Sequence, residues 1–170
     1  MESAKGKAAH AIDLCGITKT FGSVVANEDI SLSVRWGEIL ALLGENGSGK
    51  TTLMNILSGI YFPDSGTIRV NGEEQTIRVP RDAFELGIGM IHQHFKLVDV
   101  LTAAENIVLG LPGKPFLNRK ALNAEISAIS EKYGLEIEPD KKVYEMSVSE
   151  KQTVEILKVL YRGANILILD

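Results

Sequence analysis

The stretch that decides the fold is eight residues long and reads Gly44-Glu45-Asn46-Gly47-Ser48-Gly49-Lys50-Thr51. It completes the pattern G-x-x-x-x-G-K-[ST] of a phosphate loop. The apolar run 39–43 precedes it, and the helix-forming stretch 52–57 follows it. This order predicts a buried strand, a glycine turn and the start of a helix, which together aim backbone N–H groups and a helix dipole at one anion. The alternative is a glycine-rich turn that binds nothing.

The residue types within the loop suit a bound phosphate chain. Glycine at 44, 47 and 49 lets the backbone close tightly where a Cβ would clash. We expect Lys50 to reach the β- and γ-phosphates and the hydroxyl of Thr51 to bind Mg²⁺. The predicted contacts of the phosphate chain are Gly44, Asn46, Gly47, Ser48, Gly49, Lys50, Thr51 and Thr52.

Length and composition narrow the class of protein. The chain has 170 residues, of which 45% are hydrophobic, so it can bury one core with a small lobe attached. A net charge of −4 argues against a nucleic acid or an anionic membrane as the main partner. No apolar stretch approaches the roughly 20 residues of a membrane span, and one cysteine gives no disulfide framework. We therefore expect a soluble, cytoplasmic protein.

Alternating hydrophobic residues and turn residues predict an antiparallel β layer in the first half of the chain. The expected strands cover residues 11–17, 30–35 and 67–79, and the last is a hairpin because Asn71-Gly72 favours a type I′ turn. A short helix over 81–86 then leads into a buried strand over 88–92.

After residue 95 the pattern becomes helical. The periodicity predicts helices over 102–109, 119–133 and 150–161, and residues 165–169 return to a strand. Asn118 can cap the middle helix and Gly134 can end it. We therefore predict four parts: a flexible tail (1–10), a nucleotide-binding core with the β layer and the phosphate loop (11–94), a helical subdomain (95–162) and a strand returning to the core (163–170).

Three further positions complete a candidate site. Asp170 ends an aliphatic strand that we expect to be buried on both faces, so its carboxylate would lie beside a metal at the edge of the sheet. Gln93 follows the strand 88–92, and its amide can bind a metal or orient water. Ser147 or Ser149 can cap the next helix and turn its positive end toward an anion. The ordinary alternatives are a strand end, a loop residue and a plain helix cap.

In this order the pieces resemble the ATP-binding subunits of ABC transporters, from about residue 12 to residue 170. Phe21 falls where that family stacks an aromatic ring on adenine. The other correspondences are the Walker A loop at 44–51, the Q-loop at Gln93, the signature motif at 147–150 and the Walker B strand at 166–170.

The resemblance implies the fold class and the cofactor. The fold would be α/β, a P-loop NTPase (ABC-type ATPase) core with an antiparallel β subdomain and an inserted helical subdomain, incomplete at the C-terminus. The cofactors would be ATP and Mg²⁺, with Phe21 and Ser147 joining the loop residues around ATP. Thr51, Gln93 and Asp170 would bind the metal, and Lys50, Gln93 and Asp170 would be the catalytic residues.

The resemblance also implies a function. The segments 87–95 and 104–107 are similar to the branch that imports simple sugars and nucleosides. The parent protein would be an ATPase on the inner face of the cell membrane that drives solute uptake. Its partners would be a second nucleotide-binding domain, in tandem or as a dimer, and membrane-spanning permease subunits, with no nucleic acid.

Two departures from the family leave alternatives open. Ser149 stands where this branch has glycine in its signature, and a side chain there would crowd a phosphate or forbid a positive φ. The chain stops before the glutamate that polarises the attacking water, so we expect a fragment of a longer protein that is inactive alone. The alternatives are a module that binds Mg-ATP without turnover, or a non-transport ABC ATPase of DNA repair or translation.

Overall fold

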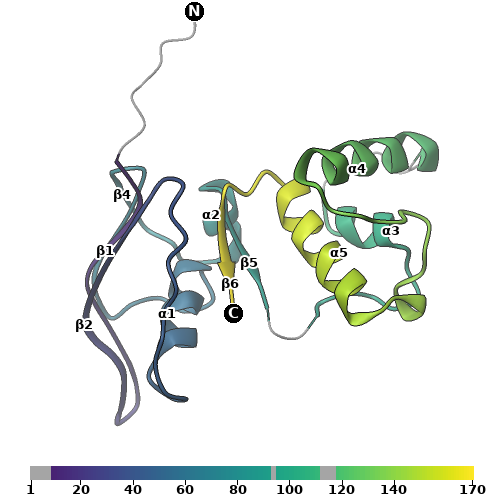
Figure 1. The fold of residues 1–170 in the computed structure, drawn as a ribbon. Coiled ribbons are helices and arrows are strands. Elements are labelled where there is room, and N and C mark those ends of the chain that lie inside the picture. Colours follow the sequence, from purple (N-terminus) through teal and green to yellow (C-terminus); the bar gives the residue numbers. More distant parts are fainter. Residues whose placement is uncertain (1–8, 93–94, 112–117) are drawn as a thin grey trace, which may run out of the picture. The chain divides into compact units, whose positions relative to one another are not determined.

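The computed structural model describes residues 9–92, 95–111 and 118–170. The chain forms two compact units, the first unit (residues 1–88) and the second unit (residues 89–170), whose elements are labelled in Figure 1. Of the expected flexible tail, residues 1–8 lie outside the described residues. The division into four parts stays a prediction.

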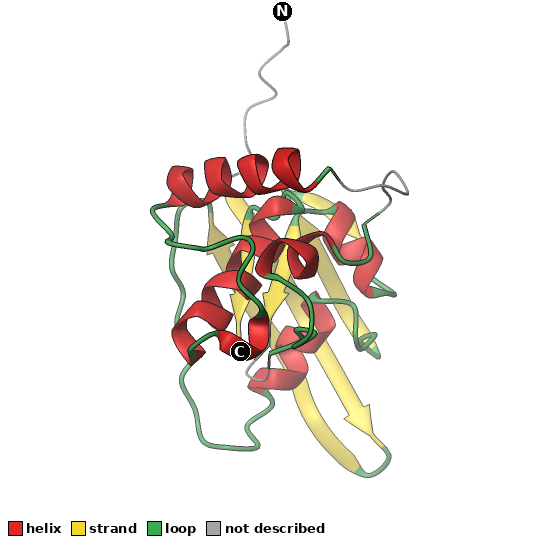
Figure 2. Cartoon of the chain, turned by 90° about the vertical axis from the view of Figure 1, so that its right-hand side faces the viewer, coloured by secondary structure: helices red, strands yellow, loops and turns green. Residues whose placement is uncertain are grey.

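A four-stranded antiparallel sheet forms the frame of the first unit, with the strand order β2-β1-β3-β4. Figure 2 shows the strands in yellow, with the long hairpin of β1 and β2 among them. Inward-facing residues of β1 such as Ile12 and Leu14 are buried, as the alternating pattern requires. The predicted antiparallel layer is confirmed, with these bounds: β1 (His10–Phe21), β2 (Val24–Arg35), β3 (Ser65–Val70) and β4 (Glu73–Gln75).

The turn between β3 and β4 follows directly from its two residues. Asn71 has a φ of 56° and Gly72 a φ of 80°, and a type I′ turn needs positive φ at both central positions. Asparagine and glycine adopt that conformation at the lowest cost. The predicted hairpin is therefore confirmed.

Two short helices complete the first unit. Helix α1 (Lys50–Leu57) begins within the glycine-rich loop and buries Leu53, Ile56 and Leu57, while α2 (Pro80–Glu85) leads toward β5 (Ile88–Ile91). Gly87 has a φ of 78° and ends the helical segment, as predicted. The division between the two units falls within β5.

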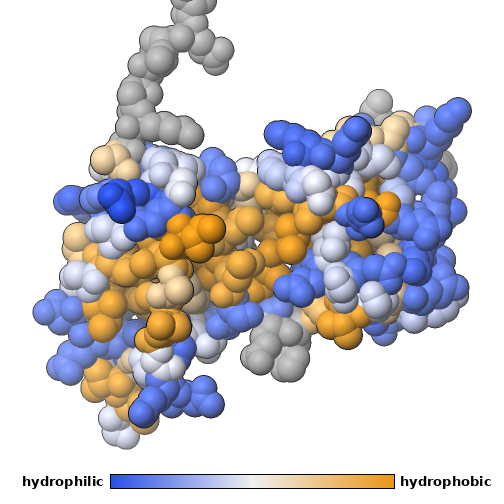
Figure 3. Space-filling model, viewed as in Figure 1, coloured by the Kyte–Doolittle hydropathy of each residue, from blue (hydrophilic) through white to orange (hydrophobic). Residues whose placement is uncertain are grey.

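The strand predicted over residues 39–43 is not formed. No strand is assigned to this segment, and Ile39 is 98% and Leu43 93% exposed. A strand needs a neighbour that pairs with its N–H and C=O groups, and none of the strands assigned in the described residues pairs with this run. Its aliphatic side chains join the hydrophobic residues that Figure 3 shows at the surface of the first unit.

Three helices pack around the core of the second unit. They are α3 (Ala103–Val108), α4 (Arg119–Tyr133) and α5 (Val148–Tyr161), with a 3-10 turn at Val143–Glu145. All three were predicted, and Asn118 and Gly134 bound α4 as expected. The described helices include none with the length and apolarity to cross a membrane. The core they share consists of Ala103, Ala104, Ile107, Leu122, Ile126, Val143, Met146, Val154 and Leu157.

Strand β6 (Ile166–Leu169) pairs with β5 and ends at Asp170, whose N–H donates to the carbonyl oxygen of Ile91 at 3.1 Å. The strand itself was predicted, but its burial on both faces was not correct. Ile168 is buried, whereas Leu167 is 42% and Leu169 72% exposed. The alternation is that of a strand with one covered face, because successive side chains point to opposite sides.

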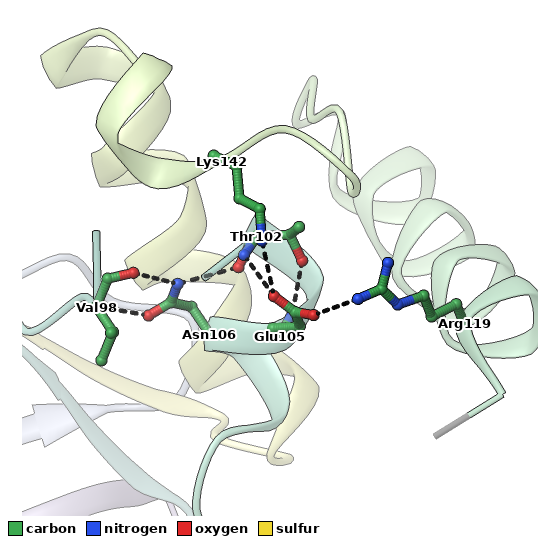
Figure 4. Close-up of polar contacts among 6 residues, drawn as sticks. All are labelled: Val98, Thr102, Glu105, Asn106, Arg119 and Lys142. Carbon is green, nitrogen blue, oxygen red and sulfur yellow. Dashed lines mark hydrogen bonds and ion pairs between the residues drawn. The ribbon is translucent and has the colours of Figure 1, made fainter. Parts of the chain in front are cut away.

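A buried asparagine ties α3 to the segment before it. Asn106 is fully buried, and its side chain donates to the carbonyl oxygens of Val98 (3.1 Å) and Thr102 (3.0 Å). Its Oδ1 accepts a hydrogen bond from the N–H of Val98 at 2.7 Å. Figure 4 shows these bonds converging on one amide. A buried amide whose bonding groups are all used fixes the local backbone strongly.

The same helix begins with a capping box. The hydroxyl of Thr102 accepts from the N–H of Glu105, and the Glu105 carboxylate accepts from the N–H of Thr102. Arg119 and Lys142 add ion pairs to that carboxylate at 2.9 and 3.5 Å (Figure 4). The hydrogen bond from Thr102 and the two cations hold the pKa of Glu105 below its usual value. Glu105 thus joins the start of α3 to two other segments of the second unit.

Candidate phosphate-binding site

The Lys50 ammonium closes the glycine-rich loop on itself. Its Nζ donates to the carbonyl oxygens of Gly44 and Glu45, both at 2.8 Å, and to the Ser48 hydroxyl at 3.2 Å. Lys50 is also the first residue of α1, so the charge lies at the start of a helix. The ammonium is therefore held at the centre of a ring of oxygen atoms formed by the loop itself.

Two of the glycines are required by contacts as well as by conformation. Gly49 has a φ of +85°, and a Cβ there would lie 2.1 Å from the carbonyl oxygen of Ala26. A Cβ at Gly44 would lie 2.8 Å from the Ser48 hydroxyl and 3.8 Å from the Lys50 ammonium. Gly47 has a φ of +84° with open space around it, so only its backbone conformation asks for glycine. The predicted tight turn is confirmed at these positions.

The other predicted loop contacts lie where a ligand could reach them. Helix α1 starts after Gly49, which supplies no side-chain cap, and no acidic residue occupies the first turn. The positive end of the helix is thus not neutralised locally. Among the remaining predicted residues, Asn46, Ser48 and Thr51 are exposed and Thr52 is half-buried.

Asn27 was missed by sequence reasoning and supports this loop from β2. It is buried, and its Nδ2 donates to the carbonyl oxygen of Gly49 at 3.2 Å. Its Oδ1 has no hydrogen-bond partner among the described residues. The available signal was its residue type, because asparagine is disfavoured in a strand unless its side chain has a task there.

Phe21 lies at the tip of the hairpin of β1 and β2. It pairs with Val24 across a two-residue turn, and its side chain is 42% exposed. The ring makes an edge-type contact with Tyr61, with centroids 5.1 Å apart, and the Lys19 ammonium lies 5.5 Å from its centroid. The predicted adenine contact is therefore a partly exposed ring held from two sides.

Ser147 caps α5, which decides between the two serines considered. Its hydroxyl accepts from the N–H of Glu150 at 3.3 Å, and the Glu150 carboxylate accepts from the N–H of Ser147 at 2.7 Å. This is a capping box. Ser149 lies within α5, where the backbone does not need a positive φ. The expected conflict between serine and a positive φ is therefore wrong, because the helix supplies a conformation that serine tolerates.

The predicted site residues are distributed over both units. Lys50 and Phe21 belong to the first unit, and Ser147 and Asp170 to the second. Gln93 lies outside the described residues. Asp170 is exposed at the end of β6. The roles given to these residues, and the approach of Asp170 to Lys50, stay predictions.

A comparison with protein families finds one match. The sequence model of the family described as "ABC transporter" matches residues 27–170. That range includes the glycine-rich loop, the capped helix α5 and the final strand. The match agrees with the resemblance predicted from the order of the motifs.

Curated relatives are similar over nearly the whole chain. The guanosine import ATP-binding protein NupO of Bacillus subtilis (strain 168) is 53% identical over 95% of this chain. The nucleoside import ATP-binding protein NupA of Lactococcus lactis subsp. cremoris (strain MG1363) is 51% identical over 94%. In both cases the chain spans 32% of the relative's length.

A solved structure shows the same fold. A nucleotide-free ATP-binding cassette from an ABC transporter superposes with a TM-score of 0.82 at 26% identity, over 95% of this chain and 68% of that chain. This agreement confirms the predicted fold class.

Proposed function

The chain belongs to the ABC transporter family, whose sequence model matches residues 27–170, and on that premise we propose that it binds ATP as part of an import ATPase. The proposed parent protein hydrolyses ATP and couples the reaction to solute uptake. Because the chain spans 32% of the length of the curated relatives, this activity is proposed for the longer protein.

The position of the Lys50 ammonium carries the proposal. Two of its three acceptors are neutral carbonyl groups, those of Gly44 and Glu45. A phosphate oxygen is charged and accepts a stronger hydrogen bond from an ammonium group. A triphosphate entering the loop would therefore take over the lysine, while backbone N–H groups at the start of α1 would face the same anion.

The residues present also fit the cofactors. At Gly44 and Gly49 a Cβ would enter occupied space, so the loop backbone can approach a ligand closely. The proposed Mg²⁺ ligands, Thr51, Gln93 and Asp170, offer the oxygen atoms that this ion prefers. When bound, Mg²⁺ would neutralise charge on the phosphates during transfer to water. Lys50 would hold the transferred phosphate, and Phe21 would hold the base.

The solute class and the partners are proposed from the relatives. Two proteins more than 50% identical to this chain are named for guosine-type solutes, one for guanosine and one for nucleosides in general. We therefore place nucleosides ahead of simple sugars as the transported class. A second nucleotide-binding domain and membrane-spanning permease subunits would complete the machine at the inner face of the membrane, with Ser147 completing the opposite domain's site.

Titration of the chain with Mg-ATP tests the proposal. Lys50→Ala is expected to weaken binding at least about tenfold, because a charge-assisted hydrogen bond to phosphate is lost. Lys120→Ala, at an exposed position of α4, is the matched control and should bind as the wild type does. Equal affinities of the wild type and Lys50→Ala in calorimetry would refute the proposed site.

The solute class needs the longer protein. The full-length ATPase with its permease subunits in vesicles should drive ATP-dependent uptake of guanosine, and Lys50→Ala should abolish it. Uptake of ribose in place of guanosine would overturn the nucleoside assignment while leaving the ATPase assignment intact.

A further inference from the structure

We infer that Asp64 is a positioning residue for the nucleobase, and that together with Tyr61 it holds Phe21 as the surface on which adenine stacks. The inference rests on the proposed function, because it assigns a task within the same ATP site. It concerns the base alone and not the triphosphate.

Asp64 fixes the end of β1 immediately before Phe21. Its carboxylate accepts hydrogen bonds from the Lys19 ammonium (2.8 Å), the Thr20 N–H (2.7 Å) and the Thr20 hydroxyl (2.7 Å). Its own N–H donates to the carbonyl oxygen of Thr18 at 2.8 Å. Four bonds from one residue therefore hold the three positions that precede the ring.

Tyr61, three positions before Asp64, contacts the ring directly. The two ring planes meet at 69°, with Tyr61 and Phe21 in an edge-type contact. Such contacts favour one relative orientation of two rings. One short segment thus restrains both the backbone before Phe21 and its side chain.

This segment is anchored on the helix that starts at the phosphate loop. The N–H groups of Ile60 and Tyr61 both donate to the carbonyl oxygen of Asn55 in α1, at 2.9 and 3.1 Å. Helix α1 therefore joins the loop at its first turn to the Tyr61–Asp64 segment at its last. The distance between a bound base and a bound triphosphate is set in this way by one rigid element.

The charge on Asp64 also places the ammonium beside the ring. Hydrogen bonds from Lys19 and then Thr20 lower the pKa of Asp64 to about 2, so the carboxylate is ionised at neutral pH. It holds Lys19 in a position 5.5 Å from the centroid of the Phe21 ring, a distance at which cation and ring attract each other. Neutralising Asp64 would release the lysine and loosen the ring.

The hydrogen bonds that the described residues make to Asp64 involve Thr18, Lys19 and Thr20, and none of them belongs to the loop 44–51. Loss of the carboxylate should therefore affect base recognition and leave phosphate recognition intact. A residue that only stabilised the fold would affect both equally.

The test compares two ligands on the chain, Mg-ATP and magnesium tripolyphosphate, which lacks the base and ribose. Asp64→Asn and Tyr61→Leu are each expected to weaken Mg-ATP binding about five- to tenfold, because base–aromatic stacking contributes roughly that much or more. Tripolyphosphate binding should change less than about twofold, since the loop is untouched. Thr20→Val, which removes one bond and keeps the shape, should have a smaller effect in the same direction.

Asp82→Asn is the matched control. Asp82 accepts hydrogen bonds from the N–H groups of Arg78 (2.8 Å) and Val79 (3.1 Å), so its loss removes comparable bonds elsewhere in the first unit. It should alter neither affinity.

Three results would overturn the inference. They are unchanged Mg-ATP affinity in Asp64→Asn, an equal loss for both ligands, or a wild type that binds both ligands equally well. A wild type that binds neither would contradict the proposed function itself, and the inference with it.

Discussion

The side-chain amide of Asn27 donates a hydrogen bond to the carbonyl oxygen of Gly49, 3.2 Å away, although 22 positions separate the two residues in the sequence. The same carbonyl accepts the N–H of Leu53 at 2.9 Å, so it is shared between β2 and α1. Asn27 is only 6% exposed. The antiparallel sheet thereby fixes the point at which the phosphate loop becomes a helix.

Asn27→Asp is expected to lower the free energy of unfolding by about 2–4 kcal/mol, because a buried carboxylate would face the carbonyl oxygen of Gly49 without a donor. Asn27→Leu removes the same hydrogen bond without adding charge, and it also removes the unpartnered Oδ1. It should therefore cost less than about 1 kcal/mol. Urea unfolding followed by circular dichroism measures both, and similar costs for the two variants would contradict the assigned contact.

Gly49→Ala and Gly47→Ala separate steric contact from backbone strain. Both glycines have a φ near +85°, at +85° and +84°, so both alanines carry a strain of about 1–2 kcal/mol. Only at Gly49 would the Cβ lie 2.1 Å from the carbonyl oxygen of Ala26, which is backbone and cannot move freely. Gly49→Ala should therefore cost at least about 2 kcal/mol more than Gly47→Ala, and equal costs in urea unfolding would be inconsistent with this contact.

Asn106→Ala should destabilise the second unit by about 2–4 kcal/mol, because it leaves the N–H and C=O of Val98 and the carbonyl oxygen of Thr102 without this partner in a buried place. Asn123→Ala, which removes one exposed hydrogen bond to Asp140, is the control and should stay within about 0.5 kcal/mol of the wild type. Hydrogen exchange at the Val98 amide gives a local readout. Unchanged protection of that amide in Asn106→Ala would count against the proposed anchoring.

The capping box of α5 predicts an acid-dependent loss of stability. Hydrogen bonds from Lys141 and then Ser147 lower the pKa of Glu150 from 4.5 to about 2. A depressed pKa in the folded state gives stability that is present above the unfolded-state value of 4.5 and is lost as the pH falls through 2. The difference in unfolding free energy between the wild type and Glu150→Gln should be largest above about pH 5 and shrink toward pH 2.

Urea unfolding at a series of pH values measures this difference, with Glu131→Gln at an exposed position of α4 as the control. The control should show no such pH dependence. A constant difference for Glu150→Gln across the series would show that its carboxylate is not held by these bonds.

Sequence reasoning succeeded where the determinants are local. The Asn71-Gly72 turn depends on the φ preferences of two residues, and α4 on a cap at Asn118, a glycine at 134 and the periodicity between them. The lysine-containing loop is also local, because its acceptors Gly44, Glu45 and Ser48 lie within six positions of Lys50. These features need no distant partner, so their sequences predict them directly.

Where the determinants are distant, sequence reasoning failed or was silent. The run 39–43 is as aliphatic as any buried strand, but strand formation depends on a paired neighbour that the run itself cannot specify. Asn27 and Asp64 escaped notice because their partners lie far along the chain, Gly49 for the first and Lys19 for the second. A single asparagine or aspartate carries no motif that indicates such a contact.

The oxygen ring around Lys50 has a consequence for how nucleotide affinity should be interpreted. The lysine already has three acceptors before any ligand arrives, so an incoming phosphate exchanges partners with the protein instead of filling an idle charge. The measured affinity then reports a difference between two sets of contacts, and it is smaller than the strength of the new ones. Substitutions that weaken the resting set, such as a change at Ser48, should for that reason tighten the grip on nucleotide.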